Sequence, residues 1–189
     1  MSLSLLSGPQ FEPLSLSDVK NWLKVTDSSD DALLQSLISS ARLAVEAATG
    51  RLLISQQWRL TLDLWPGVGT LDSPLTPVRS IARIRVMDAA GAYKDVSAAL
   101  FALDAGDDRT RIYWGASLPS PGVPKGGIQI DLVAGYGDTP DATPAPLRLA
   151  MQHLIAFWHA NRGDADPAAG HFPTQVTALL APYRLRRLV

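Results

Sequence analysis

Three histidines are among the side chains best suited to chemistry, and their spacing limits what they could do. His153 and His159 lie six residues apart on a predicted helix. They are therefore about 240° apart around its axis and cannot bind one metal ion as histidines at i and i+4 do. The pattern favours ordinary helix-surface residues. His171 precedes Phe172 and Pro173 and is interpreted as a loop residue.

An acidic cluster, Asp104, Asp107 and Asp108, has two interpretations. It could hold calcium or supply a carboxylate pair, but it lacks the ligand spacing and terminal Glu of an EF-hand loop. Aspartate is common in tight turns because its side chain bonds nearby backbone groups, so we interpret the cluster as a solvated turn. A hydrolase that used these aspartates with His159 remains a hypothesis that substitution would test.

The other motifs that carry catalysis or cofactor binding are missing from the sequence. Gly135 and Gly137 occur in GYGDTP, which has neither the Lys-Ser/Thr of a phosphate loop nor the third glycine of a dinucleotide fingerprint. No serine lies in a G-x-S-x-G elbow. The chain has no cysteine, which excludes disulfides, thiol nucleophiles and sulfur-ligated metals. We therefore predict no enzyme activity, no cofactor and no metal.

The composition is that of a globular protein with little net charge. Of the 189 residues, 47% are hydrophobic and 19% charged, which suffices for a core. The net charge of -1 excludes a molecule-wide basic field that would hold nucleic acid non-specifically. No apolar run approaches the roughly 18 residues of a membrane span, and MSLSLLSGPQ lacks a basic flank. We expect a soluble chain that is not exported.

The hydrophobic period is helical in the first part of the chain. Residues 17–25 form a short amphipathic helical pattern that begins with Ser17 as the predicted N-cap. Residues 28–50 predict a helix of about 20 residues with one apolar stripe. Ser28 and Asp31 have the spacing of a capping box, and Gly50 is the expected stop.

From residue 55 to about 137 the period changes to two, and Pro and Gly separate short runs. This pattern predicts about five to seven antiparallel strands, with a turn at 88–91. Thr143 and Pro144 then begin another helix, as N-cap and first helical residue, which ends near Gly163. A shorter helical segment follows and is broken at Pro182.

These elements indicate an α+β fold. We expect a helical core, in which a long N-terminal helix pair packs on a C-terminal helix, with an inserted small antiparallel β region. The predicted divisions are 1–54 for the N-terminal helices, 55–140 for the β region, 141–181 for the C-terminal helices and 182–189 for a tail.

The tail alternates arginines and apolar residues beyond a helix-ending proline. Arg184, Arg186 and Arg187 alternate with Leu185 and Leu188. A solvated tail is one interpretation. A segment that binds a partner protein is the other, because apolar leucine side chains are not stabilised by exposure to water. Three more arginines lie on the polar faces of predicted strands, where we favour solvent exposure over an interface: Arg59, Arg83 and Arg85.

Several stretches together resemble one family. They are DVKNWLKV, DDALLQSLISSARLAVEAATGR running into QQWRLTLD, AGYGDTPDATPAPLRLAMQHLIAFWHANR and PTQVTALLAPYR. In this order they are similar to the head–tail connector, or adaptor, proteins of long-tailed phages, prophages and gene transfer agents. The resemblance covers most of the chain and is loosest from about residue 67 to 125. The simplest members are nearly all helical, so the β region resembles an insertion.

The resemblance implies a structural protein of a phage or phage-like particle at the head–tail interface, assembled in the bacterial cytoplasm. Such adaptors form a ring, commonly of twelve copies, beneath the portal protein. The ring extends the DNA channel, passes double-stranded DNA without specific binding, and presents a platform for the next connector (stopper) or tail protein. We expect the free chain to be monomeric.

The resemblance also implies that the tail 182–189 docks into the portal. The residues carried over as portal contacts are Ala181, Pro182, Tyr183, Arg184, Leu185, Arg186, Arg187, Leu188 and Val189. An alternative from another class is a β-domain binding module of a tail or receptor-binding component. Its stacking surface would consist of Trp65, Tyr113 and Trp114.

Overall fold

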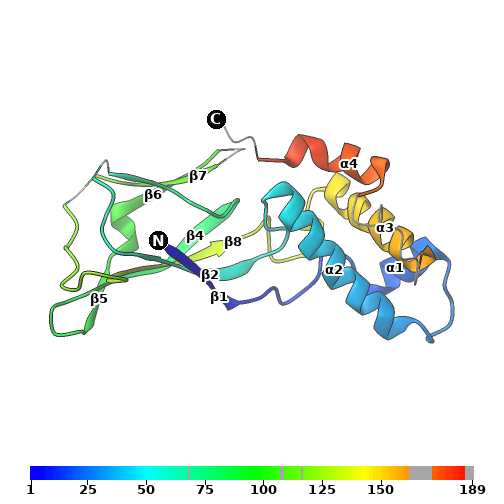
Figure 1. Ribbon diagram of the computed structural model, residues 1–189, viewed down its shortest axis with the longest axis horizontal. Helices are drawn as coiled ribbons and strands as arrows, with labels where there is room; N and C mark the ends of the chain where they lie inside the picture. Colours follow the sequence, from blue (N-terminus) through cyan, green and yellow to red (C-terminus); the bar gives the residue numbers. More distant parts are fainter. Residues whose placement is uncertain (68, 107–108, 116, 162–171, 186–189) are drawn as a thin grey trace. The chain divides into compact units, whose positions relative to one another are not determined.

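The computed structural model of the chain describes residues 1–67, 69–106, 109–115, 117–161 and 172–185. It combines helices with two antiparallel sheets, which confirms the predicted α+β class (Figure 1). The α-helices are α1 (Leu16–Leu23), α2 (Asp31–Thr49), α3 (Ala145–Ala160) and α4 (Thr174–Leu180). The strands are β1 (Ser2–Ser7), β2 (Gln56–Leu62), β3 (Thr70–Asp72), β4 (Val78–Met87), β5 (Tyr93–Val96), β6 (Phe101–Ala105), β7 (Thr110–Trp114) and β8 (Ile128–Ala134). The 3₁₀ turns are η1 (Ala98–Leu100), η2 (Pro140–Ala142) and η4 (Ala181–Tyr183).

The strands form a five-stranded sheet in the order β1-β2-β8-β4-β5 and a three-stranded sheet in the order β3-β7-β6. Strands β2 to β8 all lie in the stretch whose period of two predicted them. The predicted turn at 88–91 joins β4 to β5. There, the Asp88 backbone amide donates to the Ala92 carbonyl at 2.9 Å, and Gly91 has a φ of +80°.

Alternation along β8 explains why the larger sheet has one apolar face. Ile128, Ile130 and Leu132 are fully buried, whereas Gln129 and Asp131 between them are only half-buried and point to the opposite face. The pairing of β8 with β2 and β4 continues the same alternation across the sheet. The three-stranded sheet adds its own buried side chains to the β core, and its strand β6 contacts β4.

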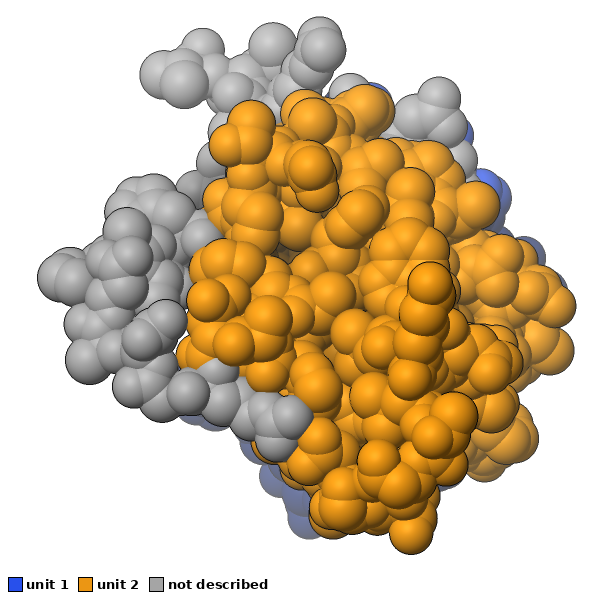
Figure 2. Space-filling model, turned by 90° about the vertical axis from the view of Figure 1, so that its right-hand side faces the viewer, with its two compact units in different colours: residues 1–9, 55–135 blue, residues 10–54, 136–189 orange. Residues whose placement is uncertain are grey.

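The first nine residues belong with the strands rather than with the helices. Residues 2–5 alternate serine and leucine, and residues 2–7 pair with β2 as the edge strand β1, with a register shift between Leu5 and Ser7. The chain accordingly divides into two compact units: Met1–Pro9 with Ser55–Gly135 (unit 1), and Gln10–Ile54 with Tyr136–Val189 (unit 2), coloured blue and orange in Figure 2. The predicted divisions had grouped the first nine residues with the N-terminal helices, because six residues are too few for their period to stand out.

Unit 2 has a core made by apolar stripes of its helices. In α2 the buried stripe includes Leu34, Ile38 and Val45, and in α3 it includes Leu147 and Leu154. α2 packs against α3, and α4 packs against α3. The helix spacing of three and four places these side chains on one face, and burial of each such side chain stabilises the fold by roughly 1.5–3 kcal/mol.

The helix starts differ from the predicted ones. α1 is capped by Ser15, which exchanges hydrogen bonds with Asp18 in a capping box. The capping box predicted for α2 is absent, because the Asp31 carboxylate accepts from the Lys20 ammonium at 2.7 Å and the N-cap is Asp30. α3 likewise begins one residue later than predicted, with Pro144 as its N-cap. Gly50 ends α2 as predicted, with a φ of +72°.

Candidate functional site

The C-terminal segment, the main functional prediction, begins where α4 ends. Val176 and Leu180 of α4 are buried in the core of unit 2. Pro182 then lies in η4, so the helix breaks where the proline predicted it. Ala181, Pro182 and Arg184 are exposed. The chain therefore emerges from the core at Leu180 and runs along the surface of its unit.

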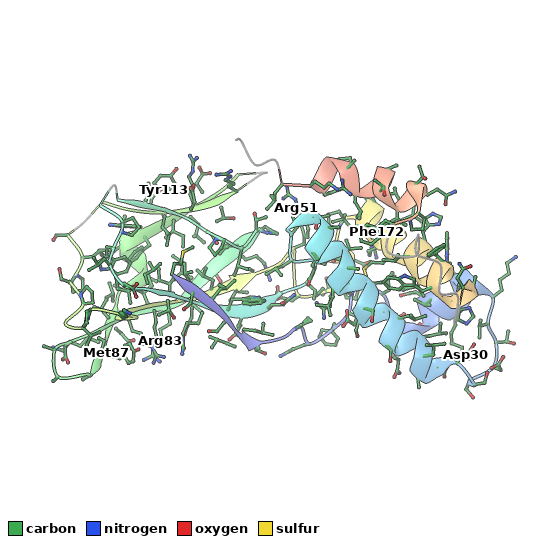
Figure 3. All side chains as sticks on the ribbon, in the orientation of Figure 1. Asp30, Arg51, Arg83, Met87, Tyr113 and Phe172 are labelled. Atoms are coloured by element: carbon green, nitrogen blue, oxygen red, sulfur yellow. The ribbon has the colours of Figure 1, made fainter. Side chains whose placement is uncertain are left out.

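This segment packs against the C-terminus of α2. We call the residues that it contacts there, Thr49, Gly50 and Arg51, the seat. The Leu185 amide donates to the Thr49 carbonyl at 3.1 Å, and the Arg51 side chain donates through Nε to the Tyr183 carbonyl at 2.7 Å (Figure 3 labels Arg51). The Leu185 side chain lies over Gly50, where an added Cβ would come within 2.8 Å of Leu185 Cδ1. Gly50 therefore serves both the left-handed end of α2 and the close approach of the C-terminal segment.

Buried polar groups hold that end of α2 in place. The Thr49 hydroxyl donates to the Val45 carbonyl at 2.7 Å. The Glu46 carboxylate accepts from the Leu53 amide and from the Arg42 guanidinium, each at 2.9 Å. Burial raises the pKa of Glu46 above its ordinary value, and these two hydrogen bonds oppose that rise in part. The C-terminal segment therefore rests on a part of α2 whose buried polar groups are hydrogen-bonded.

The predicted portal contacts fall into two groups. Ala181 to Leu185 lie on the chain's own unit 2, held through the backbone of Tyr183 and Leu185. Arg186, Arg187, Leu188 and Val189 lie outside the described residues. The side chain of Arg184 is exposed and open to a partner. Sequence reasoning missed the seat, although a glycine helix end followed by an arginine is a signal that could have suggested it.

Two of the strand arginines form bidentate pairs with acids on neighbouring strands. Arg59 donates to Asp131 at 2.7 and 2.8 Å across the β2–β8 pair. Arg83 donates to Asp95 at 2.8 and 3.1 Å across the β4–β5 pair, and this hydrogen bonding holds the pKa of Asp95 below its ordinary value. Both pairs lie on the face of the sheet away from its buried side chains. Their geometry makes this face a cross-strand ladder of charges.

Arg85 completes the same ladder. Its Nε donates to the Gln129 side chain at 2.8 Å, and its guanidinium lies 4.5 Å from the centre of the Tyr93 ring. The Gln129 amide in turn donates to the Tyr93 hydroxyl at 2.6 Å. Each of the three arginines singled out in the sequence thus pairs with side chains of neighbouring strands on the face away from the buried residues. Arg83 is exposed to solvent as expected, whereas Arg59 and Arg85 are half-buried.

The aromatic residues of the alternative hypothesis do not form one stacking surface. Trp65 and Trp114 gather with Phe101, with ring centres 5.6–6.0 Å apart, and all three are half-buried. Tyr113 precedes Trp114 in β7 and so points to the opposite face of that strand. The cluster fills space around the three-stranded sheet, as a small core would.

The histidines of α3 have structural partners. His153 packs edge-on against Trp22 with ring centres 5.5 Å apart. His159 Nε2 lies 3.0 Å from the Asp30 carboxylate at the start of α2. His171 lies outside the described residues. The two described histidines bond to different neighbours, so they do not converge on one reaction centre.

The acidic cluster is only partly described, since Asp107 and Asp108 lie outside the described residues. Asp104 is exposed on β6, opposite Arg111 of β7. Within the described ranges, no three His, Asp or Glu side chains gather closely enough to hold a metal ion. Over the same ranges, no helix combines the length and apolarity needed to cross a bilayer.

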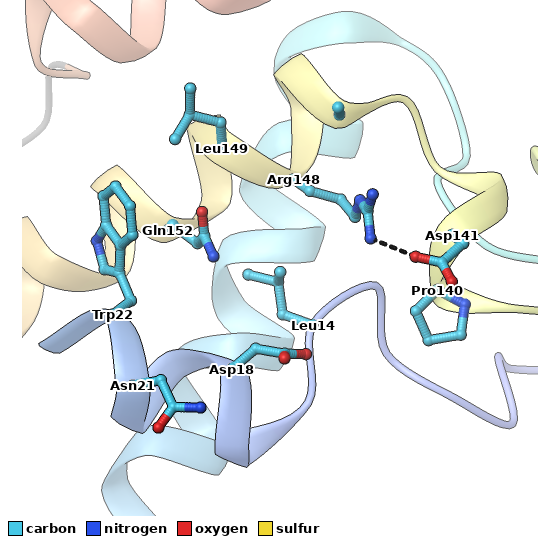
Figure 4. A pocket seen from close by; sticks show the side chains of 10 residues that line it. Leu14, Asp18, Asn21, Trp22, Pro140, Asp141, Arg148, Leu149 and Gln152 are labelled. Atoms are coloured by element: carbon cyan, nitrogen blue, oxygen red, sulfur yellow. Dashed lines mark hydrogen bonds and ion pairs between the residues drawn. The ribbon is translucent and has the colours of Figure 1, made fainter. Parts of the chain in front are cut away.

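An open groove of about 790 Å³ between α1 and α3 was not predicted (Figure 4). Trp22, which is 42% exposed, lies along it. Its charges are already paired: Asp141 accepts from Arg148 at 2.7 Å, and Ser15 hydrogen bonds lower the pKa of Asp18. The groove therefore offers a mixed surface for contact and no activated group for catalysis.

Comparison with known proteins gives a consistent result. Residues 13–82 match the family described as phage gp6-like head-tail connector protein. No curated protein matches the sequence at a significant level. Among solved structures, the chain is similar over its whole length to a chain from the "Neck of empty GTA particle computed with C6 symmetry". The identity is 30%, the TM-score is 0.85, and 98% of that chain is covered.

Two further structures agree. A chain from the "Virion of native gene transfer agent (GTA) particle" has 29% identity and a TM-score of 0.85. A chain from the "Neck of native GTA particle computed with C12 symmetry" has 31% identity and a TM-score of 0.82. All of this chain and 98% of each of those chains are covered. The matched helices, the full-length likeness and the resemblance of the terminal segments lead to one conclusion: the chain belongs to the phage gp6-like head–tail connector family, whose members are structural proteins of the particle neck.

Proposed function

We propose that this connector forms a ring beneath the portal of a phage-like particle and extends the DNA channel from the head towards the tail. One observation carries the proposal: the chain matches, end to end and at 31% identity, a protein from a neck computed with C12 symmetry. The next connector or a tail protein binds the face of the ring that points away from the portal. The particle is assembled in the bacterial cytoplasm.

Ring formation in our proposal depends on the portal. Copies in a cyclic ring touch through two different surfaces, and closure on a partner that already has the symmetry adds avidity to weak contacts. We therefore expect a monomer when the chain is alone and twelve copies in the particle. Light scattering of the purified protein tests this expectation, and a stable free ring would contradict it.

The charge distribution supports a channel through which DNA slides. A strongly cationic wall would bind many phosphates and release their counterions, which would slow the movement of DNA. The net charge of this chain is -1, and the outward-facing Arg59 and Arg83 are each paired with an aspartate. Neither guanidinium is left to attract the backbone of passing DNA.

The C-terminal segment is the proposed portal contact, from Ala181 to Val189. Its backbone is held at Tyr183 and Leu185, so the following four residues begin from a defined point on unit 2. An anchored start lowers the entropy lost when the remaining residues enter a socket. Two arginines and two apolar side chains then supply charge-assisted hydrogen bonds and buried area.

The test is a short truncation. Deletion of residues 186–189 leaves Leu185 and the whole seat in place, so the fold should be retained by circular dichroism and thermal unfolding. We expect binding to purified portal rings to weaken about tenfold or more, since about 1.4 kcal/mol corresponds to a factor of ten. Binding unchanged within twofold would refute the docking proposal.

A charge-matched control separates a specific role from a general charge effect. Reversal of Arg186 and Arg187 to Glu should weaken portal binding as the truncation does. Reversal of the exposed Lys24 and Lys125 to Glu changes the net charge equally at positions outside the segment. Equal losses from both double variants would mean that only overall charge matters and would contradict the proposal.

A further inference from the structure

The N-terminal strand β1 leaves an unprotected sheet edge in unit 1. It pairs with β2 on one side, and in the described part of the chain no strand follows on the other. All six of its residues, SLSLLS, are exposed. Natural proteins usually blunt such an edge with charges, proline or a covering segment, because its free backbone groups invite another strand. β1 has no charge and no proline; its pairing with β2 has a register shift between Leu5 and Ser7, which leaves Ser2 to Leu5 in regular register.

The apolar face of the larger sheet continues onto this edge without cover. Leu3 lies opposite Leu60 and Leu5 opposite Trp58, so both leucines share the face that carries the buried residues of the sheet. Leu60 is fully buried, whereas Leu3 is 37% and Leu5 51% exposed. The edge therefore offers both unpaired backbone groups and uncovered apolar side chains.

The opposite edge of the same sheet, β5, carries two charged residues, Lys94 and Asp95, but each is already paired with a side chain of opposite charge. The Lys94 ammonium lies 3.2 Å from the Asp88 carboxylate, and Asp95 is held by Arg83. A neutral strand that adds to β5 would meet no unpaired side-chain charge among these residues. Lys94 lies opposite Val86 and thus on the same face as Leu3 and Leu5. The two edges can therefore continue one sheet without a mismatch of faces.

The symmetry of the similar necks suggests what covers the edge. In a cyclic ring of more than two copies, each copy meets one neighbour with one surface and the other neighbour with a different one. The two edges of a five-stranded sheet meet this requirement, since β1 and β5 are its first and last strands. We propose that β1 of one copy pairs along β5 of the next copy in the ring. This inference rests on the proposed ring.

Cysteine cross-linking tests the pairing, because the natural chain has no cysteine. The variants Leu3→Cys/Lys94→Cys and Leu5→Cys/Lys94→Cys place one thiol on each edge and cover two registers. Within one copy the edges are about four strand spacings, roughly 19 Å, apart, which is too far for a disulfide. Mild oxidation of assembled necks should give a ladder of covalent multimers of this chain on a non-reducing gel.

The outcomes distinguish the two proposals. No ladder from necks that contain the variant chain, or a bond from β1 to a different neck protein, would overturn the edge pairing and leave the ring intact. An equal ladder from the control Leu5→Cys/Leu43→Cys, whose second site is an exposed position on α2, would also overturn it. Absence of the wild-type chain from the neck would refute the proposed function itself.

A second pair of variants serves if the thiols disturb assembly. Leu3→Lys/Leu5→Lys adds two charges to exposed positions of the edge, so the chain should fold with an unchanged circular dichroism spectrum. Its incorporation into necks should fall about tenfold, whereas the control Leu43→Lys/Leu64→Lys, also at exposed leucines, should be incorporated normally. Normal incorporation of the edge variant would overturn the inference.

Discussion

The substitution Gly50→Ala tests how the C-terminal segment is held. Gly50 ends α2 with a φ of +72°, and the Leu185 side chain lies directly over its Cα. Alanine there must adopt the left-handed conformation, which costs about 1–2 kcal/mol. The new methyl group would also come within 2.8 Å of Leu185 Cδ1, so that side chain must move.

The two costs can be separated with a second substitution. Displacing a flexible leucine end from its rotamer costs about 0.5–1.5 kcal/mol, so Gly50→Ala should lower the free energy of unfolding by about 1.5–3.5 kcal/mol. In a Leu185→Ala background the clash is gone and only the backbone cost remains. The expected coupling between the two sites is therefore about 1 kcal/mol.

Urea unfolding of the wild type, the two single variants and the double variant measures this coupling, and hydrogen exchange reports the segment directly. The Leu185 amide, which donates to the Thr49 carbonyl, should exchange at least tenfold faster in Gly50→Ala. If Gly50→Ala costs the same in both backgrounds within about 0.3 kcal/mol, Leu185 does not rest on Gly50 and the reasoning fails.

Two further predictions concern charges. Burial raises the pKa of Glu46 in the folded state, so the stability that Glu46 contributes is present below its unfolded pKa and is lost as pH rises through its folded pKa. Glu46→Gln should remove this loss of stability. A pH profile of urea midpoints that is the same in the variant as in the wild type would contradict the prediction. A double-mutant cycle on Arg59 and Asp131, which are largely shielded from solvent, should give a coupling free energy of about 1 kcal/mol. The same cycle on the exposed Arg83 and Asp95 should give a clearly smaller coupling, because water screens an exposed ion pair. A larger coupling for the exposed pair would refute this reasoning.

The hydrophobic period and the positions of glycine and proline were sufficient to predict the main helices and strands. The apolar stripes of α2 and α3, the alternation of β2, β4 and β8, and the stop at Gly50 all arise from local rules that act within a few turns or strands. For the same reason the interpretation of Arg59, Arg83 and Arg85 as outward-facing agrees with the structure, since side chains of a strand alternate whatever the strand packs against.

The features that were missed depend on contacts between distant parts of the chain. Asp31 could cap α2 by its spacing, but Lys20 of α1 takes its carboxylate. The edge strand β1 forms because β2, some fifty residues away, offers it a partner. The seat of the C-terminal segment joins Arg51 to Tyr183, and no local pattern contains a separation of 132 residues.

The most direct test of the central claim is an electron cryo-microscopy reconstruction of particles that contain this chain. The account predicts a ring of the chain between the portal and the tail, with residues 186–189 inserted in the portal. A neck in which the chain is absent, or in which those residues fold back on their own subunit away from the portal, would contradict it.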